Sequence, residues 1–420
     1  MPSAISPQLR VAVIGTGPGG LSSAIALSEL PNIDLRVYEK AGELKNLGAG
    51  ISVNHNGWKV LELLGIRDRV NGASTNPTVQ RNAYTGEIVD PGVPHDPSDA
   101  YEALRVKRLV LQEALAEKVP EGLIEFNKKL VGLKDLGKDG VKVLFEDGTE
   151  TIVDLVVGAD GIRSVGWRCL VPAKRLKHIR DLPLTTTSWW YGKAKSLWLS
   201  PVDADLSNLT DIEFTARVFN EPPVPGRTVS WGVRVSNDEV FSRFSDCDPR
   251  LAQVFAQVPE GNWTEFAAYA GPSMDSLVAW DKLVLVGDSS HPSAAGGFGS
   301  GSAFAMEDSW TLARAIEYAR SIKGSDASPS VVAEALRVFD AIRKPYYKAM
   351  SDFRKSQKEV LKEVGRKEYV DFDSDLRERF AKDGLGAKRG KGFLGFVYGN
   401  DIGKVCKEFF ETEQARRNGN

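Results

Sequence analysis

Hydrophobic positions near the start of the chain show two kinds of pattern. The apolar run VAVI (11–14), rich in β-branched residues, predicts a buried strand over 10–15. The residues from 21 to 29 predict a helix, and IDLRVYEK over 33–40 predicts a second strand. A strand, a helix and a strand within about 30 residues match the size of a crossover unit between parallel strands. The opening segment therefore predicts an α/β fold.

Helical spacing of apolar residues recurs in three later segments. Residues 54–65 and 105–119 place apolar side chains three or four positions apart, which predicts amphipathic helices. Residues 330–350 show the same pattern, and Pro345 predicts an interruption there, because proline lacks the N–H that a helix interior needs. We therefore expect helices on both sides of a middle region that is rich in strands.

The middle of the chain is dominated by strand patterns. From 123 to 159 short runs with a period of two predict strands, and Glu146-Asp147-Gly148 is a hairpin signal. Residues 175–275 are rich in Trp, Thr, Val and Phe, which predicts a mostly antiparallel sheet inserted into the first fold, and a buried strand of the first kind returns at 282–288. We expect a discontinuous first domain that consists of residues 1–174 and 276–330. Residues 175–275 are expected to form the inserted sheet, and part of 70–105 is a candidate to belong to it. Residues 331–420 are expected to form C-terminal helices and a tail.

Composition narrows the function classes. Of the 420 residues, 42% are apolar and 26% are charged, and the net charge is −2. We therefore expect a packed core and no basic field that would attract nucleic acid. The three cysteines are far apart in the sequence, which favours a reducing compartment. With no apolar signal segment and no run near the roughly 20 residues that cross a bilayer, we expect a cytoplasmic monomer or homodimer that binds neither nucleic acid nor membranes.

A glycine-rich turn, GTGPGG over 15–20, follows the first predicted strand directly. Gly15 permits a tight turn, Gly17 lets the backbone approach a pyrophosphate, and Gly20 permits close packing of helix and strand. The N-terminus of the following helix offers unpaired N–H groups and a partial positive charge to phosphates. By itself this motif also fits a tight turn without a ligand. Glu39, at the end of the second strand, can accept hydrogen bonds from ribose hydroxyls, which favours FAD or NAD.

Two further motifs lie at the ends of predicted buried strands. Asp160-Gly161 follows the apolar run before it, and Arg163 comes two residues later. Gly287-Asp288 ends a second apolar run and precedes a loop of small residues that allows the backbone to wrap around a ligand. The carboxylate of Asp288 can accept a hydrogen bond from a polyol hydroxyl. A helix that begins near 300–303 is expected to face developing negative charge.

These three motifs, in this order, resemble those of the FAD-dependent aromatic hydroxylases, the class A flavoprotein monooxygenases, over about residues 8–365. The resemblance implies an α/β, Rossmann-type FAD-binding domain with an inserted, mostly antiparallel substrate domain and a helical C-terminal region. It implies that the glycine turn binds the ADP part of FAD, that Asp160-Gly161 serves FAD and NAD(P)H, and that Asp288 holds the ribityl chain. By register, the resemblance also places Arg108, or alternatively Arg105, against the flavin phosphates. It implies that the backbone of Gly48-Ala49-Gly50 contacts FAD near the adenosine or the flavin. The implied FAD-binding residues are Gly15, Gly17, Gly20, Glu39, Lys40, Gly50, Arg108, Asp160, Gly161, Asp288, Gly299 and Gly301.

The segment around 291–309 and the C-terminal tail resemble the fungal, salicylate hydroxylase-like branch of this family. The implied activity is NADH- or NADPH-dependent hydroxylation of a phenolic ring with O2, through a flavin C4a-hydroperoxide on resident FAD. A salicylate-type substrate is expected, with a larger aromatic compound of secondary metabolism as the alternative. Some salicylate-type enzymes carry a histidine where this chain has Ala294-Ala295-Gly296-Gly297, so the usual activation of the phenol is in doubt. His291 is interpreted as structural.

The inserted sheet is expected to supply the substrate pocket, because aromatic walls suit a phenolic ring. Candidate catalytic residues there are Tyr191, Arg217 and Arg234, and His55 is a candidate near the predicted flavin ring. An arginine among them could pair with a carboxylate. Since successive strand residues point to opposite faces, the sequence leaves open which of them point inward, with Trp189, Trp190 and Trp231 equally undecided.

Other function classes remain open at this point. An NAD-dependent dehydrogenase would explain Gly15–Gly20 and Glu39 but not the motif at Asp288. A flavin-binding sensor without hydroxylase activity would share all three motifs. The four histidines are too widely spread to predict a metal site.

Overall fold

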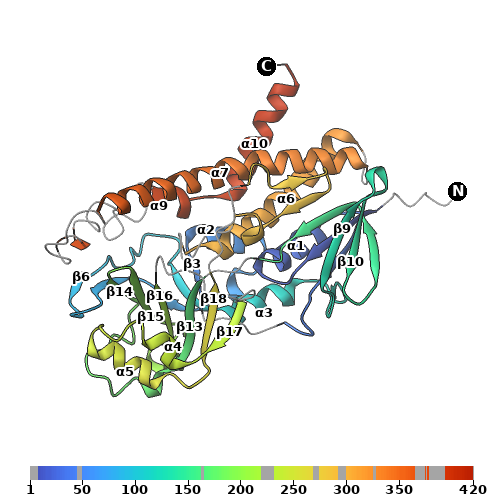
Figure 1. Ribbon diagram of the computed structural model, residues 1–420. Coiled ribbons are helices and arrows are strands. Elements are labelled where there is room, and N and C mark those ends of the chain that lie inside the picture. The colour runs from blue at the N-terminus through green and yellow to red at the C-terminus, as the bar shows by residue number, and fades with distance from the viewer. Residues whose placement is uncertain are drawn as a thin grey trace.

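The computed structural model shows a parallel-sheet domain and an eight-stranded sheet side by side, with the long helix α7 (Pro329–Val364) running along the top of the molecule (Figure 1). The residues that the structure describes are 8–44, 50–161, 165–218, 231–267, 274–291, 299–324, 328–364, 374, 376–377 and 393–419. The motif residues Gly48, Ala49 and Arg163, and the loop residues 292–298, lie outside these ranges.

The parallel sheet is built around β1 (Leu9–Ile14). Its strand order is β19-β20-β12-β1-β2-β8, and every neighbouring pair is parallel except β19 and β20. The other strands are β2 (Ile33–Tyr38), β8 (Ile124–Glu125), β12 (Leu155–Gly158), β19 (Val278–Ala279) and β20 (Leu283–Leu285). Because β1 is covered on both faces, its residues after Arg10 are apolar without alternation. The predicted Rossmann-type arrangement is confirmed.

Two layers cover the parallel sheet. Val11 and Val13 of β1 join the core formed with α1 (Pro18–Ser28), α3 (Arg108–Lys118) and α6 (Gly301–Lys323). Ala12 and Ile14 point the other way, into the core formed with the antiparallel sheet. That sheet consists of β9 (Leu130–Asp135), β10 (Val141–Phe145) and β11 (Glu150–Val153), and the predicted turn at 146–148 joins its last two strands.

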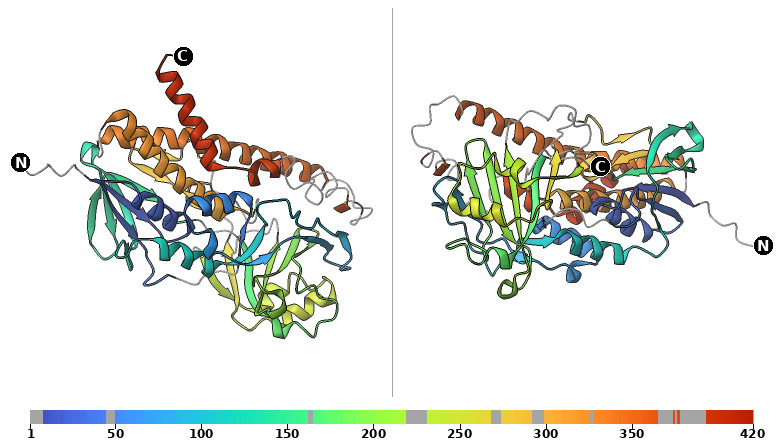
Figure 2. Two further views of the ribbon diagram at one scale, coloured as in Figure 1. Left: turned by 180° about the vertical axis from the view of Figure 1, so that it is seen from behind. Right: turned by 60° about the horizontal axis from the view of Figure 1, so that its bottom comes forward.

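The eight-stranded sheet has the order β17-β18-β13-β16-β15-β14-β5-β6, and only β14 and β5 run parallel. Its strands are β5 (Val79–Asn82), β6 (Ile88–Asp90), β13 (Val165–Pro172), β14 (Ser188–Gly192), β15 (Lys195–Pro201), β16 (Asp211–Val218), β17 (Trp231–Val235) and β18 (Trp263–Ala267). Helices α4 (Asn237–Phe241) and α5 (Pro249–Gln257) cover one face (Figure 2). Strand β13 of this sheet begins at Val165, whereas we expected the inserted sheet to begin after residue 174.

A small sheet joins the two large ones. It consists of β3 (Gly50–Val53), β7 (Leu104–Lys107) and β4 (Ala73–Ser74), and α2 (His55–Leu63) follows β3. The helix expected over 105–119 begins only at Arg108, because residues 105–107 pair with β3 instead. Short 3-10 turns complete the connections: η1 (Arg67–Arg69), η2 (Gly137–Asp139), η3 (Ala173–Arg175), η4 (Leu206–Asn208) and η5 (Gly287–Ser289).

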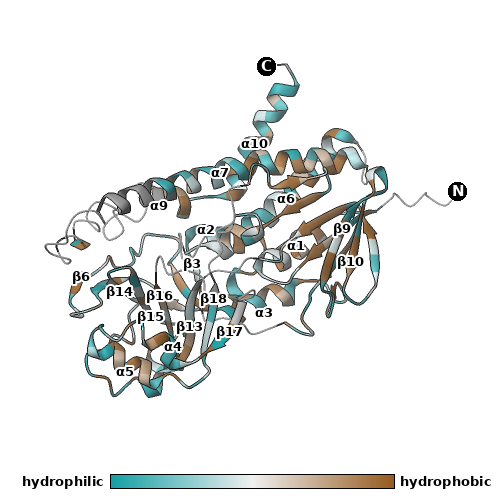
Figure 3. Cartoon of the chain, viewed as in Figure 1, coloured by the Kyte–Doolittle hydropathy of each residue, from teal (hydrophilic) through white to brown (hydrophobic). Residues whose placement is uncertain are grey.

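The C-terminal region is helical. The interruption predicted at Pro345 is wrong, because α7 continues through it, with Ile342, Tyr346 and Tyr347 buried in the core on either side. Helices α9 (Phe393–Tyr398) and α10 (Ile402–Arg417) follow, and the end of α10 projects from the body as a largely hydrophilic segment (Figure 3). Within the described ranges, no helix combines the length and the apolar character that a membrane crossing requires.

Candidate active site

The glycine turn between β1 and α1 is shaped to receive a ligand. Gly15 has φ +106°, and a Cβ at this position would lie 2.6 Å from the carbonyl oxygen of Ala159. A Cβ at Gly20 would lie 1.8 Å from the carbonyl oxygen of Gly15, so helix and turn approach too closely for any side chain. A Cβ at Gly17 would meet nothing within 4 Å. The backbone is therefore accessible at Gly17, at the N-terminus of α1, which suits a pyrophosphate.

The carboxylate of Glu39 lies beside this turn. Its Oε2 accepts hydrogen bonds from the backbone N–H of Thr16 (3.0 Å) and from the Thr16 hydroxyl (2.6 Å), and its Oε1 accepts one from the Ala41 N–H (2.8 Å). Both lone pairs of Oε2 are used in these bonds, but Oε1 retains one, so Glu39 can still accept a hydrogen bond from a ribose hydroxyl. The next residue, Lys40, is exposed to solvent.

The turn after β12 lies next to the glycine turn. The Cα of Asp160 would be 3.4 Å from a Cβ at Gly15, so the first two sequence motifs are neighbours in space. Gly161 has φ +74° and a Cβ there would meet nothing within 4 Å. Asp160 and Gly161 are both exposed. Both residues thus lie at an exposed edge beside the glycine turn.

Asp288 and Arg108 lie close enough at the carboxyl edge of the parallel sheet for their charges to interact. Asp288 lies in η5, and its Oδ1 would be 3.6 Å from a Cβ at Gly301, the first residue of α6. Burial raises the pKa of Asp288 despite the opposing charges of His291 and Arg108. Burial lowers the pKa of Arg108, the first residue of α3, and Asp288 opposes that shift. A cation and a carboxylate at two helix N-termini suit the phosphate and polyol parts of a dinucleotide. Gly299, whose carbonyl accepts from Asn54 Nδ2 (3.3 Å), lies just before α6.

Arg105, the alternative to Arg108 in the sequence, has a different partner. It forms a buried bidentate ion pair with Glu213 of β16, with Nε bonded to Oε2 and Nη2 to Oε1 (2.5 and 2.6 Å). A Cβ at Gly50 would lie 2.5 Å from Glu213 Oε2 and 2.6 Å from Arg105 Nε. Gly50 is therefore a glycine because this ion pair packs against it. The pair ties the small sheet of β3, β7 and β4 to the eight-stranded sheet.

The face of the eight-stranded sheet opposite α4 and α5, here called the site face, is aromatic and charged. Cross-strand register places Trp189 opposite Trp198, Trp198 opposite Thr215, and Thr215 opposite Arg168. Since side chains at paired positions and at every second position share a face, Tyr191, Glu213 and Arg217 belong to the same face. The rings of Trp189 and Trp198 meet edge to face at 4.5 Å between centroids. The predicted candidate Trp190 points the other way, into the core.

Arg217 is the most distinctive side chain of the site face. Its guanidinium lies over the Trp189 ring, 5.2 Å from the centroid. Burial and the charges of Arg168 and Arg105 lower its pKa to about 9, so it remains a cation at neutral pH. Within the described ranges, no carboxylate lies within ion-pair distance of it. Arg217 nevertheless keeps accessible surface, as do Arg108, Arg168 and Asp288. These four charged side chains are thus only partly buried.

The remaining candidates lie at the margins. Arg234 is exposed on the edge strand β17, where it donates to the carbonyl oxygen of Asn262 (3.0 Å). His55 begins α2 and meets the Tyr101 ring at 6.2 Å. Trp231 is the first residue of β17.

Sequence reasoning missed Glu213, Arg168 and Trp198. The signal available was charge at every second position of a strand, since Glu213 and Arg217 alternate with apolar residues in DIEFTARV.

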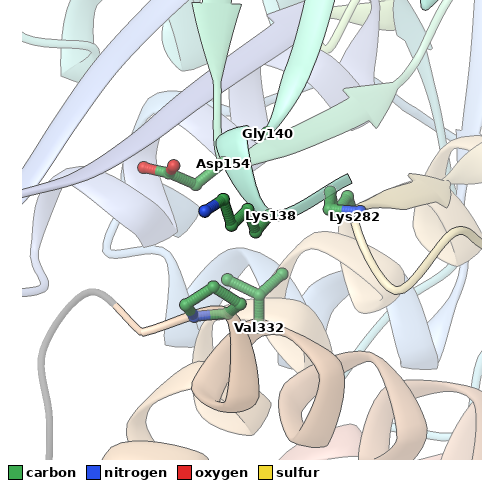
Figure 4. A pocket seen from close by; sticks show the side chains of 6 residues that line it. Lys138, Gly140, Asp154, Lys282 and Val332 are labelled. Carbon is green, nitrogen blue, oxygen red and sulfur yellow. The ribbon is translucent and has the colours of Figure 1, made fainter. Parts of the chain in front are cut away.

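Small surface depressions lie away from this site. One, between the β9–β11 sheet and the start of α7, is lined by Lys138, Gly140, Asp154, Lys282, Pro329 and Val332 (Figure 4). It has room for about one water molecule. A larger one beside α2 is lined by Trp58, Arg67, His95, Asp99, Ala100, Tyr101, Glu102 and Leu104. Neither includes a residue of the site face.

A family model described as an FAD binding domain matches residues 8–186 of the chain. The 3-amino-4-hydroxybenzoate 2-monooxygenase of Streptomyces cremeus is 28% identical over 366 residues, covering 81% of this chain and 84% of that protein. A salicylate hydroxylase of Pseudomonas putida is 24% identical over 388 residues, covering 82% and 83%. A solved salicylate hydroxylase substrate complex superposes with a TM-score of 0.73 at 19% identity, covering 96% of this chain and 98% of that one. The last comparison shows the shared fold.

Proposed function

The chain belongs to the FAD-dependent aromatic hydroxylases, the class A flavoprotein monooxygenases, and from this premise we propose that its substrate is a single-ring phenol that carries a carboxylate. The enzyme is an FAD-dependent monooxygenase that uses NAD(P)H as co-substrate. A salicylate-type hydroxybenzoate is the substrate class that we infer. The relatives named for 3-amino-4-hydroxybenzoate and for salicylate both take a hydroxylated benzoate.

Arg217 carries this proposal. Within the described part of the chain, Arg217 is a deep cation with no carboxylate at ion-pair distance. Such a cation is costly unless a ligand supplies the anion. A guanidinium binds a carboxylate through two parallel hydrogen bonds, which also fixes the orientation of the ring to which the carboxylate is attached. Arg168 and Arg105 lie close enough to add positive potential, although Glu213 neutralises part of it. The site face therefore favours an anionic substrate over a neutral one.

The aromatic residues of the site face complete the proposed binding site. Trp189 stacks with Tyr191 at 5.9 Å between centroids and meets Trp198 edge to face, which provides flat apolar surface for a phenolic ring. When FAD is bound, it supplies the oxygen-transfer chemistry, and the residues that we assign to hold it are the glycine turn, Glu39, Arg108 and Asp288. The chain's own contribution is to hold the substrate ring at one orientation, to keep water away from it and to neutralise its carboxylate.

A matched pair of substrates tests the proposal. Salicylate and salicylamide have nearly the same shape and differ in the charge of one group. We expect salicylate to stimulate NAD(P)H oxidation with a kcat/KM at least about tenfold above that of salicylamide, because a charge-assisted bidentate pair is lost with the amide. The products are identified by mass, and catechol with CO2 is the expected outcome. Equal stimulation by the two compounds, or peroxide without a hydroxylated product, would contradict the salicylate-type assignment.

Two more compounds separate this proposal from the alternatives. A hydroxynaphthoate tests for a larger substrate, and a higher kcat/KM with it than with salicylate would favour a larger aromatic compound. A panel of phenols that leaves NAD(P)H oxidation flat would favour a flavin-binding sensor instead.

A further inference from the structure

A fully buried carboxylate, Asp308 of α6, connects the turn that carries Asp288 to helix α7. Its Oδ2 accepts the backbone N–H of Gly287 (2.8 Å) and lies 3.2 Å from Nε2 of His291. Its Oδ1 accepts hydrogen bonds from Nε of Arg343 (2.7 Å) and from the hydroxyl of Tyr347 (2.5 Å). One carboxylate oxygen thus faces the turn and the other faces α7.

Arg343 balances two adjacent buried carboxylates. Besides Asp308 it pairs with Glu307, with Nη2 2.9 Å from Oε2, and Glu307 in turn accepts from Nδ2 of Asn56 (3.1 Å). Burial opposes the charge of Arg343, but the neighbouring Tyr347, Asp308 and Glu307 raise its pKa well above the ordinary value. Burial likewise opposes the charge of Asp308, but Arg343 and His291 hold its pKa below the ordinary value. Without Arg343, Asp308 and Glu307 would repel each other in a medium of low polarity.

The turn is held at both of its ends. A Cβ at Gly287, which has φ +62°, would lie 2.8 Å from the Cβ of Ala305, so the turn packs directly on α6. At the other end the His291 ring stacks on the Tyr347 ring, 3.8 Å between centroids and 22° between planes. Asp288 lies between these two anchors and is not itself bonded to Asp308.

From this geometry we propose that Arg343 and Tyr347 are positioning residues for the cofactor, because they hold Asp308 in the orientation that places the turn with Asp288. The family match ends at residue 186, so helix α7 lies beyond it. The proposal rests on the assignment of Asp288 to FAD made under the proposed function. A loosened turn samples more conformations, and FAD binding must then order it again, which weakens affinity.

Titration of the apoprotein with FAD, followed by flavin fluorescence, tests the proposal on the full chain. In Tyr347→Phe the ring still stacks on His291, but one hydrogen bond to the Asp308 carboxylate is lost. We expect the Kd for FAD to rise roughly five- to tenfold, the range for part of a hydrogen bond to a charged group. At saturating FAD, kcat should stay within about twofold of the unchanged enzyme, because Tyr347 is buried in the core and is not among the residues assigned to substrate or FAD.

Tyr346→Phe is the matched control. The hydroxyl of Tyr346 comes from the same helix but donates to the carbonyl oxygen of Val397 on α9 (3.1 Å). Its loss should lower the melting temperature of the apoprotein about as much as Tyr347→Phe does, and should leave the Kd for FAD within about twofold. Equal increases in Kd for the two variants would show that α7 acts only through general stability and would overturn the proposal.

Two further variants separate failure of this proposal from failure of the assignment beneath it. Arg343→Lys keeps the charge but loses the fork of two ion pairs, and its Kd for FAD should rise at least as much as that of Tyr347→Phe. Asp288→Ala should lose FAD on desalting. If Asp288→Ala loses FAD while neither α7 variant changes Kd, the positioning role is wrong and the proposed function stands. If Asp288→Ala keeps stoichiometric FAD, both the assignment of Asp288 and the positioning role are wrong.

Discussion

The two faces of the eight-stranded sheet are built from the same strands and have opposite characters. On the core face, beneath α4 and α5, Phe214 packs against the rings of Phe255 and Trp263 at 4.8 and 5.2 Å between centroids. On the site face, the residues next to it in the chain, Glu213 and Thr215, lie with Arg217 among other charged and aromatic side chains. Along β16, apolar residues that point into the core therefore alternate with polar and charged residues that point to the site face.

From this difference we infer that the core face contributes mainly to stability and the site face mainly to function. The core face is held by the burial of apolar surface and by contacts between aromatic rings, which stabilise the fold and need no charged partner. The site face carries the guanidinium groups of Arg168 and Arg217. Arg217 has no carboxylate partner within the described ranges. Residues 213, 214 and 217 of one strand therefore should respond to substitution in three different ways, which the following predictions use.

The largest effect is expected on the core face. Phe214→Ala removes a fully buried ring and should lower the free energy of unfolding by about 3–5 kcal/mol. Because the ring points away from the site, the KM for the substrate should stay nearly unchanged at a temperature where the variant is folded. Urea unfolding gives the stability change. A variant of unchanged stability with a raised KM would reverse our assignment of the two faces.

A slightly smaller loss is expected from Glu213→Gln, one residue earlier. The change leaves Arg105 without its carboxylate in a buried position and should lower the free energy of unfolding by about 3 kcal/mol. Burial alone would raise the pKa of Glu213, but Arg105 and Arg168 hold it below the ordinary value. A carboxyl group with a lowered pKa stabilises the fold above its unfolded pKa, so this contribution should disappear in acid as the pH falls through the folded value.

Unfolding measured against pH checks this sign. Glu146→Gln, which breaks the exposed pair with Lys129, is the control and should change the free energy of unfolding by no more than about 0.5 kcal/mol. If the two variants lose the same stability, the pair between Arg105 and Glu213 does not connect the domains energetically.

Arg217→Met should affect binding rather than folding. Removing a deep cation that has no carboxylate partner in the described part of the chain should leave the melting temperature unchanged or raise it. The KM for a phenolic carboxylate should rise roughly 30- to 100-fold, as expected for about 2–3 kcal/mol from a charge-assisted bidentate pair. The KM for its neutral amide should change little. A similar increase for both compounds would mean that Arg217 does not contact the carboxylate.

The smallest effect is expected at the exposed edge of the same sheet. Arg234→Ala removes a side chain that bonds to the Asn262 carbonyl and is open to solvent. Both KM and the melting temperature should therefore stay close to those of the unchanged enzyme. Steady-state kinetics with the same pair of compounds checks this. A KM increase comparable to that of Arg217→Met would return Arg234 to the substrate site.

Much of the dinucleotide-binding half could be predicted from local sequence. The turn at Gly15–Gly20 and the positions of Glu39 and Asp288 at strand ends follow from short motifs whose backbone geometry allows few alternatives. The helix over 105–119 was predicted three residues too long, since the pairing of β7 with β3 is a contact between distant segments. The continuity of α7 through Pro345 was missed for the same reason, because packing in the core outweighs a local signal.

The sequence alone predicts FAD binding at a glycine turn followed by a helix, because each of the three motifs is a local arrangement that suits phosphates or hydroxyls. It also determined that the inserted region is an aromatic sheet. Only the tertiary structure decided which face of that sheet meets the cofactor domain, since a period of two gives each strand two equivalent faces. Only the tertiary structure paired Arg105 with Glu213, 108 positions away, and left Arg217 with no carboxylate at ion-pair distance within the described residues.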